Sequence, residues 1–257
     1  MQRTVWITGA SSGIGREFAR RYARLGFRVI LTARRRDRLE ALAAELKHRY
    51  RTPCRILTAD LEQDADCEAL CAALAEERID LFINNAGFGT CGSFLETDPD
   101  KELSMIRVNV LAMHRLFKFA LKKMQTQGFG TILNVASSAG LLPGGPYMAG
   151  YYASKSYVVS LTRGVAEELR EQHSPVYVCA LCPGPVNTEF NEHADVVFAL
   201  KGISPEVCVA EAMRGMLRHQ TIIVPSALMR LATTAQKLVP SPLLMPILAR
   251  QQKRKLG

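Results

Sequence analysis

The chain has 257 residues, enough for one large core, and 33 basic against 24 acidic side chains give it a net charge of +9. Eight basic residues follow Glu211, the last acid, so residues 1–211 carry only +1 and the chain is not an evenly basic, nucleic-acid-coating protein. The seven cysteines are scattered, which argues against a disulfide scaffold and favours the cytoplasm. The histidines are isolated, which argues against a metal site. There is no uncharged apolar run of about 18 residues, so no membrane-spanning helix is expected.

The first predicted element is an apolar, β-branched strand over 4–8, and no signal peptide is expected before it. A glycine-rich turn and an amphipathic helix over 16–23 follow. Glycines let the backbone approach a pyrophosphate, and the free N–H groups of the first helical turn face it. The sequence therefore predicts a dinucleotide site, although its spacing is G-x-x-x-G-x-G rather than G-x-G-x-x-G. Its expected cofactor contacts are Gly9, Ser11, Ser12, Gly13, Ile14 and Gly15.

Strand and helix signals then alternate along the chain. Strands are predicted at 27–32, 54–58, 79–83, 130–135, 176–181 and 221–224, and helices at 37–49, around 70–74, from 98 to about 125, and at 151–172. This alternation predicts an α/β fold, a single-domain, Rossmann-like, doubly wound parallel sheet of about seven strands with helices on both faces. We assign residues 1–225 to this domain and 226–257 to a basic, apolar C-terminal extension.

Candidate functional residues follow the predicted strand ends. Ligands of an open parallel sheet bind outside its carboxyl edge, so these residues are expected to converge on one cleft. They are Gly9, Arg34, Asp60, Asn84, Ser138 and Pro183. Cys179 and Cys182 form a C-x-x-C pattern, but they lie in an apolar run and are interpreted as buried strand residues.

Tyr151 and Lys155 are spaced to lie on one face of a helix, one turn apart. A neighbouring positive charge favours the phenolate and is expected to lower the tyrosine pKa, which makes the phenol a usable general acid or base. The spacing alone is a weak signal, because two common residues meet it often by chance. Its meaning depends on the other motifs of the chain.

Five features in order resemble the short-chain dehydrogenase/reductase family, in its branch of about 250 residues. Residues 8–15 are similar to its T-G-x-x-x-G-x-G motif, 84–87 to N-N-A-G, and 183–188 to P-G-x-V-x-T. Asn109 falls where the family has its helical asparagine. Ser138 precedes Tyr151 by thirteen residues, the family's usual spacing.

The resemblance implies a catalytic set of Asn109, Ser138, Tyr151 and Lys155. Tyr151 would give a proton to a carbonyl oxygen, and Ser138 would hydrogen-bond the same oxygen. Lys155 would lower the Tyr151 pKa and bind the nicotinamide ribose, and Asn109 would anchor a water that links Lys155 to solvent. Both Tyr151 and Lys155 are thus also cofactor-binding candidates.

The predicted second strand is followed by Arg34 and Arg35, and no acidic residue appears before Asp37. An arginine there accommodates the 2′-phosphate of NADP, whereas NAD needs an acid, so NADP(H) is predicted. The alternative is a solvated loop of arginines. The resemblance implies further contacts with the adenine, ribose and nicotinamide, at Asp60, Leu61, Asn85, Ala86, Gly87, Pro183, Gly184, Val186 and Thr188.

Two largely apolar segments, 141–148 and 190–200, are expected to border a pocket for a lipophilic ketone, aldehyde or acyl chain. The predicted function is a cytoplasmic NADPH-dependent carbonyl reductase, assembled as a homodimer or homotetramer and needing no metal. A 3-oxoacyl-carrier reductase and a non-catalytic NADP(H)-binding sensor or scaffold remain alternatives. For the C-terminal extension, a lid or subunit contact is favoured over contact with an anionic membrane surface.

Overall fold

Seven parallel strands form one sheet, in the order β3-β2-β1-β4-β5-β6-β7, in the computed structural model, which describes residues 2–189 and 202–253. The strands are β1 (Thr4–Thr8), β2 (Arg28–Ala33), β3 (Cys54–Thr58), β4 (Leu81–Asn84), β5 (Gly130–Val135), β6 (Val176–Leu181) and β7 (Ile222–Ile223). The predicted doubly wound sheet is confirmed. The segment 190–200, predicted to border the pocket, lies outside the described residues.

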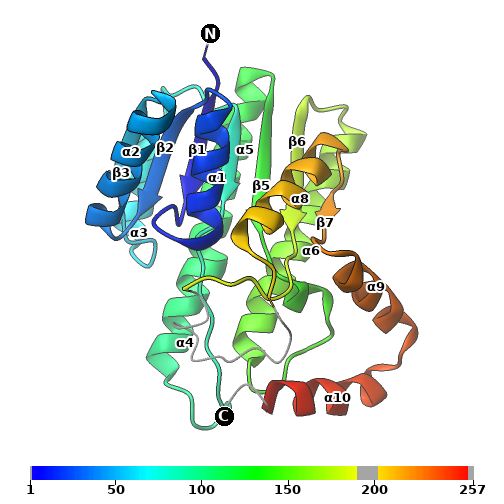
Figure 1. Cartoon of the computed structure of the whole chain (residues 1–257). Helices are drawn as coiled ribbons and strands as arrows, with labels where there is room; N and C mark the ends of the chain where they lie inside the picture. The colour runs from blue at the N-terminus through cyan, green and yellow to red at the C-terminus, as the bar shows by residue number, and fades with distance from the viewer. Residues whose placement is uncertain (1, 190–201, 254–257) are drawn as a thin grey trace.

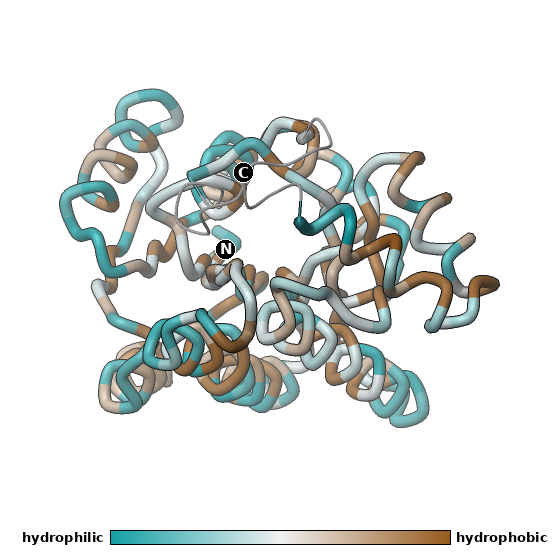
Figure 2. The backbone as a smooth tube through the Cα atoms, turned by 90° about the horizontal axis from the view of Figure 1, so that it is seen from below, coloured by the Kyte–Doolittle hydropathy of each residue, from teal (hydrophilic) through white to brown (hydrophobic). Residues whose placement is uncertain are grey.

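Helices cover both faces of the sheet (Figure 1). One hydrophobic layer lies under α1 (Gly13–Arg24), α2 (Arg36–Tyr50) and α8 (Pro205–Leu217). The other lies under α3 (Asp64–Ala73), α5 (Met113–Gln127) and α6 (Ala149–Glu171). Hydrophobic and hydrophilic stretches alternate along the coils around the sheet, as expected for helices with one buried face (Figure 2).

The central strand β1 is buried along its whole length, because layers of helices cover both sides of it. Val5 and Ile7 face one layer and Trp6 faces the other. The Trp6 ring stacks on Phe82 of β4 with ring centroids 4.0 Å apart, and its Nε1 donates to Thr32 Oγ1 of β2 at 3.0 Å. This pairing satisfies the one polar atom of the indole inside the core.

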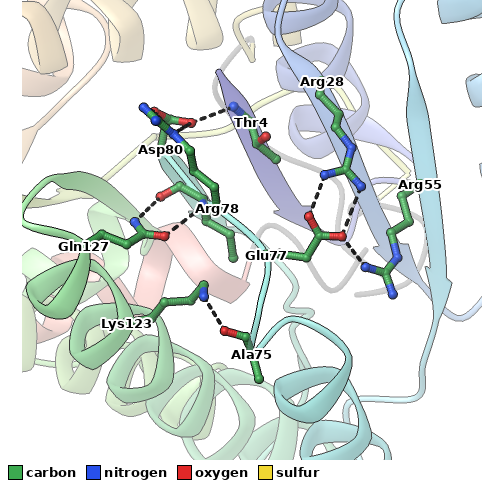
Figure 3. Close-up of polar contacts among 10 residues, drawn as sticks. Thr4, Arg28, Arg55, Ala75, Glu77, Arg78, Asp80, Lys123 and Gln127 are labelled. Carbon is green, nitrogen blue, oxygen red and sulfur yellow. Dashed lines mark hydrogen bonds and ion pairs between the residues drawn. The ribbon is translucent and has the colours of Figure 1, made fainter. Parts of the chain in front are cut away.

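The strands end in register at one edge of the sheet. Thr8 pairs with Thr32, Asn84 with Asn134, and Val135 with Leu181. The segments that follow these strands are therefore gathered at the carboxyl edge. At the opposite edge, shown in Figure 3, Glu77 accepts hydrogen bonds from Arg28 of β2 and Arg55 of β3.

The long helix predicted from 98 to about 125 consists of three parts. It begins at α4 (Pro99–Ile106), where the Asp98 side chain accepts from Asp100 N, passes through a π-helical turn (Arg107–Ala112) and continues as α5. A π turn inserts one residue into the helical repeat and often occurs at functional sites. Here it carries Asn109.

The C-terminal residues form α9 (Ala227–Ala235), a 3₁₀ turn (Gln236–Leu238) and α10 (Ser241–Lys253). These elements lie below the carboxyl edge of the sheet rather than over either of its faces (Figure 1). Leu248 and Gln252 of α10 are buried, so the segment packs onto the domain. Within the described residues, no helix has the length and apolar character needed to cross a membrane.

Candidate active site

A cavity of about 780 Å³ opens at the carboxyl edge of the sheet, between the strand ends and the C-terminal helices. Most of the residues predicted from the sequence line it. They are Gly9, Ser11, Ser12, Gly13, Ile14, Arg34, Arg35, Asp60, Leu61, Asn85, Ala86, Gly87, Ser138, Tyr151, Lys155, Pro183, Gly184, Val186 and Thr188. Gly15, Asn84 and Asn109 are not part of the lining, and Asn84 is instead buried with its side chain bonded to Met113 O and Asn134.

The glycine-rich turn has a backbone shape that side chains oppose. Gly9 and Gly13 have φ values of +63° and +52°, in the left-handed region that favours glycine. A Cβ at Gly15 would come within 2.4 Å of Gly9 O, so this glycine lets the start of α1 pack against the turn. Gly15 therefore packs against the side of the turn that faces away from the cavity, so it is absent from the cavity wall.

The segment after β4 is fastened to the end of β1. Thr8 Oγ1 accepts from the backbone N–H groups of Asn85 and Ala86, at 2.9 and 3.1 Å. The Asn85 amide donates in turn to Thr8 O at 2.9 Å. These bonds hold the two neighbouring loops at a fixed separation on the floor of the cavity.

Two arginines follow β2 at the rim of the cavity. Arg35 is half-buried, donates to Ser11 Oγ at 3.1 Å and pairs with Glu189 at 3.0 Å. Arg34 is more exposed and pairs with Glu62 at 3.2 Å. The Arg35 guanidinium thus lies beside the glycine-rich turn, whose helix α1 has no acidic residue in its first turn.

Tyr151 and Lys155 lie in the first turns of α6, both buried. The Lys155 Nζ is 5.9 Å from the centroid of the Tyr151 ring and donates to Val135 O of β5 at 3.1 Å. Burial lowers the Lys155 pKa to about 8. Burial also raises the Tyr151 pKa to about 12, opposite to the lowering that the sequence predicted, because desolvation of the phenolate is the dominant effect.

The serine that contacts Tyr151 is Ser137 rather than the predicted Ser138. Ser137 and Tyr151 share a side-chain hydrogen bond, which partly offsets the rise in the Tyr151 pKa. Ser137 is extended, with φ −167° and ψ 159°, and its Oγ caps the 3₁₀ turn Ser138–Leu141 by accepting from Ala139 N. Ser138 is the first residue of that turn, and its N–H donates to Pro183 O. Ser138 also lines the cavity.

Asn109 lies behind Gly87 and is almost completely buried. Its Oδ1 accepts from Phe88 N at 3.1 Å, and its Nδ2 donates to Phe88 O and Ser154 Oγ at 2.8 and 3.1 Å. A Cβ at Gly87 would approach Asn109 Oδ1 to 2.7 Å and Lys155 Nζ to 3.1 Å. The side chain of Asn109 therefore joins the loop after β4 to α6, directly beside Lys155.

The remaining wall of the cavity is largely apolar. Leu142 and Met148 contribute from the predicted segment 141–148. The C-terminal helices add a wall that the sequence did not resolve into residues, with Met229, Ala232, Thr233, Gln236, Leu244, Ile247, Leu248, Gln251 and Gln252. Gln252 donates to the Tyr152 hydroxyl and so ties α10 to α6. A repeat of apolar residues at every fourth position, Leu244 and Leu248, is the sequence signal for this inward face.

The cavity suits an elongated dinucleotide. One end has a glycine-rich turn, where Cβ atoms at Gly9 and Gly13 would close the space in front of Asn85 and Thr188. The other end brings Tyr151 and Lys155 to the same wall. The cavity therefore combines a glycine-rich turn at a helix N-terminus, which can bind phosphate, with a phenol that can donate a proton.

Comparisons with known proteins agree with this geometry. The short chain dehydrogenase family model matches residues 3–196. A very-long-chain 3-oxoacyl-CoA reductase of Meyerozyma guilliermondii is 35% identical over 179 residues, which are 65% of this chain and 52% of that protein. The chain thus spans about half the length of that relative.

Two solved structures have the same fold. The short-chain dehydrogenase from Sphingobium yanoikuyae in complex with NADPH has a TM-score of 0.84 and 33% identity, over 94% of this chain and 95% of that one. The short chain dehydrogenase/reductase from Burkholderia phymatum in complex with NAD has a TM-score of 0.82 and 26% identity, over 94% and 96%. This chain belongs to the short-chain dehydrogenase/reductase family.

Proposed function

We propose that this protein reduces a lipophilic ketone or aldehyde to the alcohol, with NADPH, in the cytoplasm. The observation that carries the proposal is the joint position of Tyr151, Ser137 and Lys155 in a cavity with a glycine-rich turn at one end and an apolar wall at the other. A bound nicotinamide cofactor would supply the hydride to the carbonyl carbon.

The protein's own residues handle the proton and the developing charge. With a pKa of about 12, the Tyr151 phenol is protonated at neutral pH and can donate its proton to the carbonyl oxygen as that oxygen becomes negative. The Ser137 hydroxyl donates a second hydrogen bond to the same oxygen. The nearby Lys155 ammonium favours the phenolate that remains, until the phenol regains a proton from solvent.

NADPH is proposed as the preferred cofactor because Arg34 and Arg35 follow β2, and an arginine at this position accommodates the 2′-phosphate of NADP. Arg35 is already oriented by Ser11 at the glycine-rich turn, and a guanidinium pairs bidentately with phosphate. One solved structure with the same fold is a complex with NADPH and another is a complex with NAD. The fold therefore does not distinguish the two cofactors, and the preference for NADPH is supported by the arginines.

The apolar wall supports a lipophilic substrate. A 3-oxoacyl thioester is the second candidate, supported by the similarity to a very-long-chain 3-oxoacyl-CoA reductase. The exposed apolar residues Leu103, Ile106 and Leu111 of α4 and the π turn support assembly of this enzyme as a homodimer or homotetramer.

The test compares turnover of ketones, aldehydes and 3-oxoacyl thioesters with NADPH and NADH. We expect NADPH turnover, and we expect Tyr151→Phe to lower kcat by about 10²- to 10⁴-fold, because the proton donor is lost. NADPH affinity, measured by fluorescence, should remain within a few-fold of the wild type. The matched control is Tyr152→Phe, which removes the neighbouring phenol on α6 and should keep most of the turnover.

Undiminished reduction by Tyr151→Phe would show that the proposed proton donor is wrong. A wild-type protein that binds NADPH but reduces no substrate would instead support the sensor or scaffold alternative. Faster turnover with NADH than with NADPH would overturn the cofactor assignment and leave the roles of Tyr151 and Ser137 intact.

A further inference from the structure

The C-terminal hairpin, residues 227–253, has two apolar faces. One faces the cavity, and on α10 it includes Leu244 and Leu248, with the polar Gln252 one turn further along the helix. A helix that only covers a cavity has polar residues on its outer side. The outer side of this hairpin instead exposes large apolar residues.

Five large aliphatic side chains form this outer surface: Leu228, Leu231, Leu238, Leu243 and Ile247. Leu238 is 87% exposed and Leu243 is 64% exposed, so neither takes part in the core. The helix α10, which carries Leu243 and Ile247, lies at the lower end of the molecule in Figure 1, and Figure 2 views the molecule from that end. Clustered exposed leucines mark an interaction surface rather than ordinary scatter.

The charge of the hairpin has one sign. The sequence has no Asp or Glu after Glu211, and Arg250 and Lys253 are exposed on α10. Lys253 lies over the Tyr147 ring, 5.7 Å from its centroid, and its ammonium remains at the surface. Arg230 of α9 is partly offset by Glu211, which is 3.7 Å away. An apolar surface that lies next to the exposed cations Arg250 and Lys253 complements an anionic lipid surface.

We propose that the outer surface of the C-terminal hairpin binds an anionic phospholipid bilayer, with Leu238 and Leu243 in the headgroup region and Arg250 and Lys253 against the lipid phosphates. Ile247 is 59% exposed and also lines the cavity, so the surface is continuous with the cavity entrance. The binding does not depend on the proposed function. If that function holds, lipophilic substrate can enter the cavity from the bilayer.

The experiment is co-sedimentation of the full-length protein with vesicles of phosphatidylcholine alone or mixed with phosphatidylglycerol. We expect binding to the mixed vesicles, and roughly thirtyfold weaker partitioning for the double variant Arg250→Gln/Lys253→Gln, since each cation near an anionic surface contributes about 1 kcal/mol. The double variant Leu238→Gln/Leu243→Gln should bind at least tenfold more weakly. Glutamine has nearly the helix propensity of leucine, so α10 should still form with glutamine in place of Leu243.

Matched controls lie on helices at the amino edge of the sheet. Leu25→Gln/Leu217→Gln replaces leucines that are 56% and 83% exposed, and Arg24→Gln/Lys47→Gln removes the same two charge types. Both controls should bind vesicles like the wild type. Far-ultraviolet circular dichroism and NADPH fluorescence establish that every variant is folded.

Failure of the wild type to bind mixed vesicles would overturn the proposal. It would also be overturned if the hairpin variants bound as strongly as their controls. A third contrary result is dissociation of an oligomer by Leu238→Gln/Leu243→Gln without loss of vesicle binding, which would make the surface a subunit contact. None of these outcomes depends on turnover, so they are independent of the Tyr151→Phe test.

Discussion

At the scale of single residues, Lys155 and Tyr151 are governed by burial. Removing an ammonium from water favours its neutral form, which lowers the Lys155 pKa from 10.5 to about 8. The same removal raises the pKa of the Tyr151 phenol to about 12. Near pH 7, Tyr151 is therefore protonated and Lys155 mostly charged, and these are the two states that the proposed carbonyl reduction requires.

A pH dependence follows from the Lys155 pKa. Below about 8 the ammonium is present, so kcat/KM for reduction should be level, and above about 8 it should fall as Lys155 loses its proton. In Lys155→Arg the guanidinium stays charged throughout, so the variant should be slower but should lack this fall near pH 8. Reduction rates with NADPH from pH 6 to 10 measure both. An unchanged break in Lys155→Arg would assign it to another group.

The two serines show what sequence spacing can and cannot predict. Counting thirteen residues back from Tyr151 selects Ser138, whereas the hydrogen bond to Tyr151 comes from Ser137. The difference arises because Ser137 is still extended while Ser138 begins a 3₁₀ turn, so their side chains point in different directions. Local backbone geometry of this kind is not encoded in a spacing, although the adjacent pair of serines located the position to within one residue.

At the scale of elements, the strand–turn–helix unit of β1 and α1 was predictable from the sequence, because its turn has a backbone shape that only glycine fits without steric conflict. The π turn over Arg107–Ala112 was not, since its residues also suit an ordinary α-helix. It forms where Asn109 bonds to Phe88 and Ser154, and those partners are distant in sequence. Apolar periodicity gave the extent of this helix, but tertiary contacts decided its internal geometry.

Two helix glycines should respond oppositely to alanine. A Cβ at Gly15 of α1 would meet Gly9 O at 2.4 Å, so Gly15→Ala should destabilise the protein by roughly 1–3 kcal/mol and weaken NADPH binding. A Cβ at Gly164 of α6 meets nothing within 4 Å, so Gly164→Ala should stabilise it by about 0.5–1 kcal/mol. Urea unfolding and NADPH fluorescence measure both variants. Equal stability of Gly15→Ala and the wild type would contradict the close packing of α1 on the turn.

At the scale of the whole molecule, the two edges of the sheet differ in the features that they carry. The carboxyl edge has the cavity, the glycine-rich turn and the C-terminal hairpin. The amino edge has ion pairs between elements, among them the contacts of Glu77 with Arg28 and Arg55 in Figure 3. Motifs in the sequence marked the glycine-rich turn and the segments that follow the strands at the carboxyl edge, but they did not mark the wall formed by the C-terminal helices. The sequence predicted none of the amino-edge pairs, because charged residues carry no signature of their partners.

This division predicts that stability and activity can be changed separately. The hydrogen bond from the Arg28 guanidinium has the largest effect on the Glu77 carboxyl and lowers its pKa. Burial raises this pKa and Arg55 lowers it, so the net result is a lowered pKa. Glu77→Gln therefore removes a paired, half-buried charge. We expect a loss of about 1–3 kcal/mol in the free energy of unfolding. Since a protein of this size loses about 2–4 °C in Tm per kcal/mol, the melting temperature should fall by several degrees.

The kcat/KM of Glu77→Gln should stay within twofold of the wild type at 25 °C, because Arg28, Arg55 and Glu77 do not line the cavity. The matched control is Glu40→Gln, which breaks the exposed pair with Arg36 within α2 and should leave Tm nearly unchanged. Thermal unfolding and steady-state rates on the same samples measure both quantities. A large drop in kcat/KM without a change in Tm would show that the amino edge is coupled to the active site and that the two edges do not act separately.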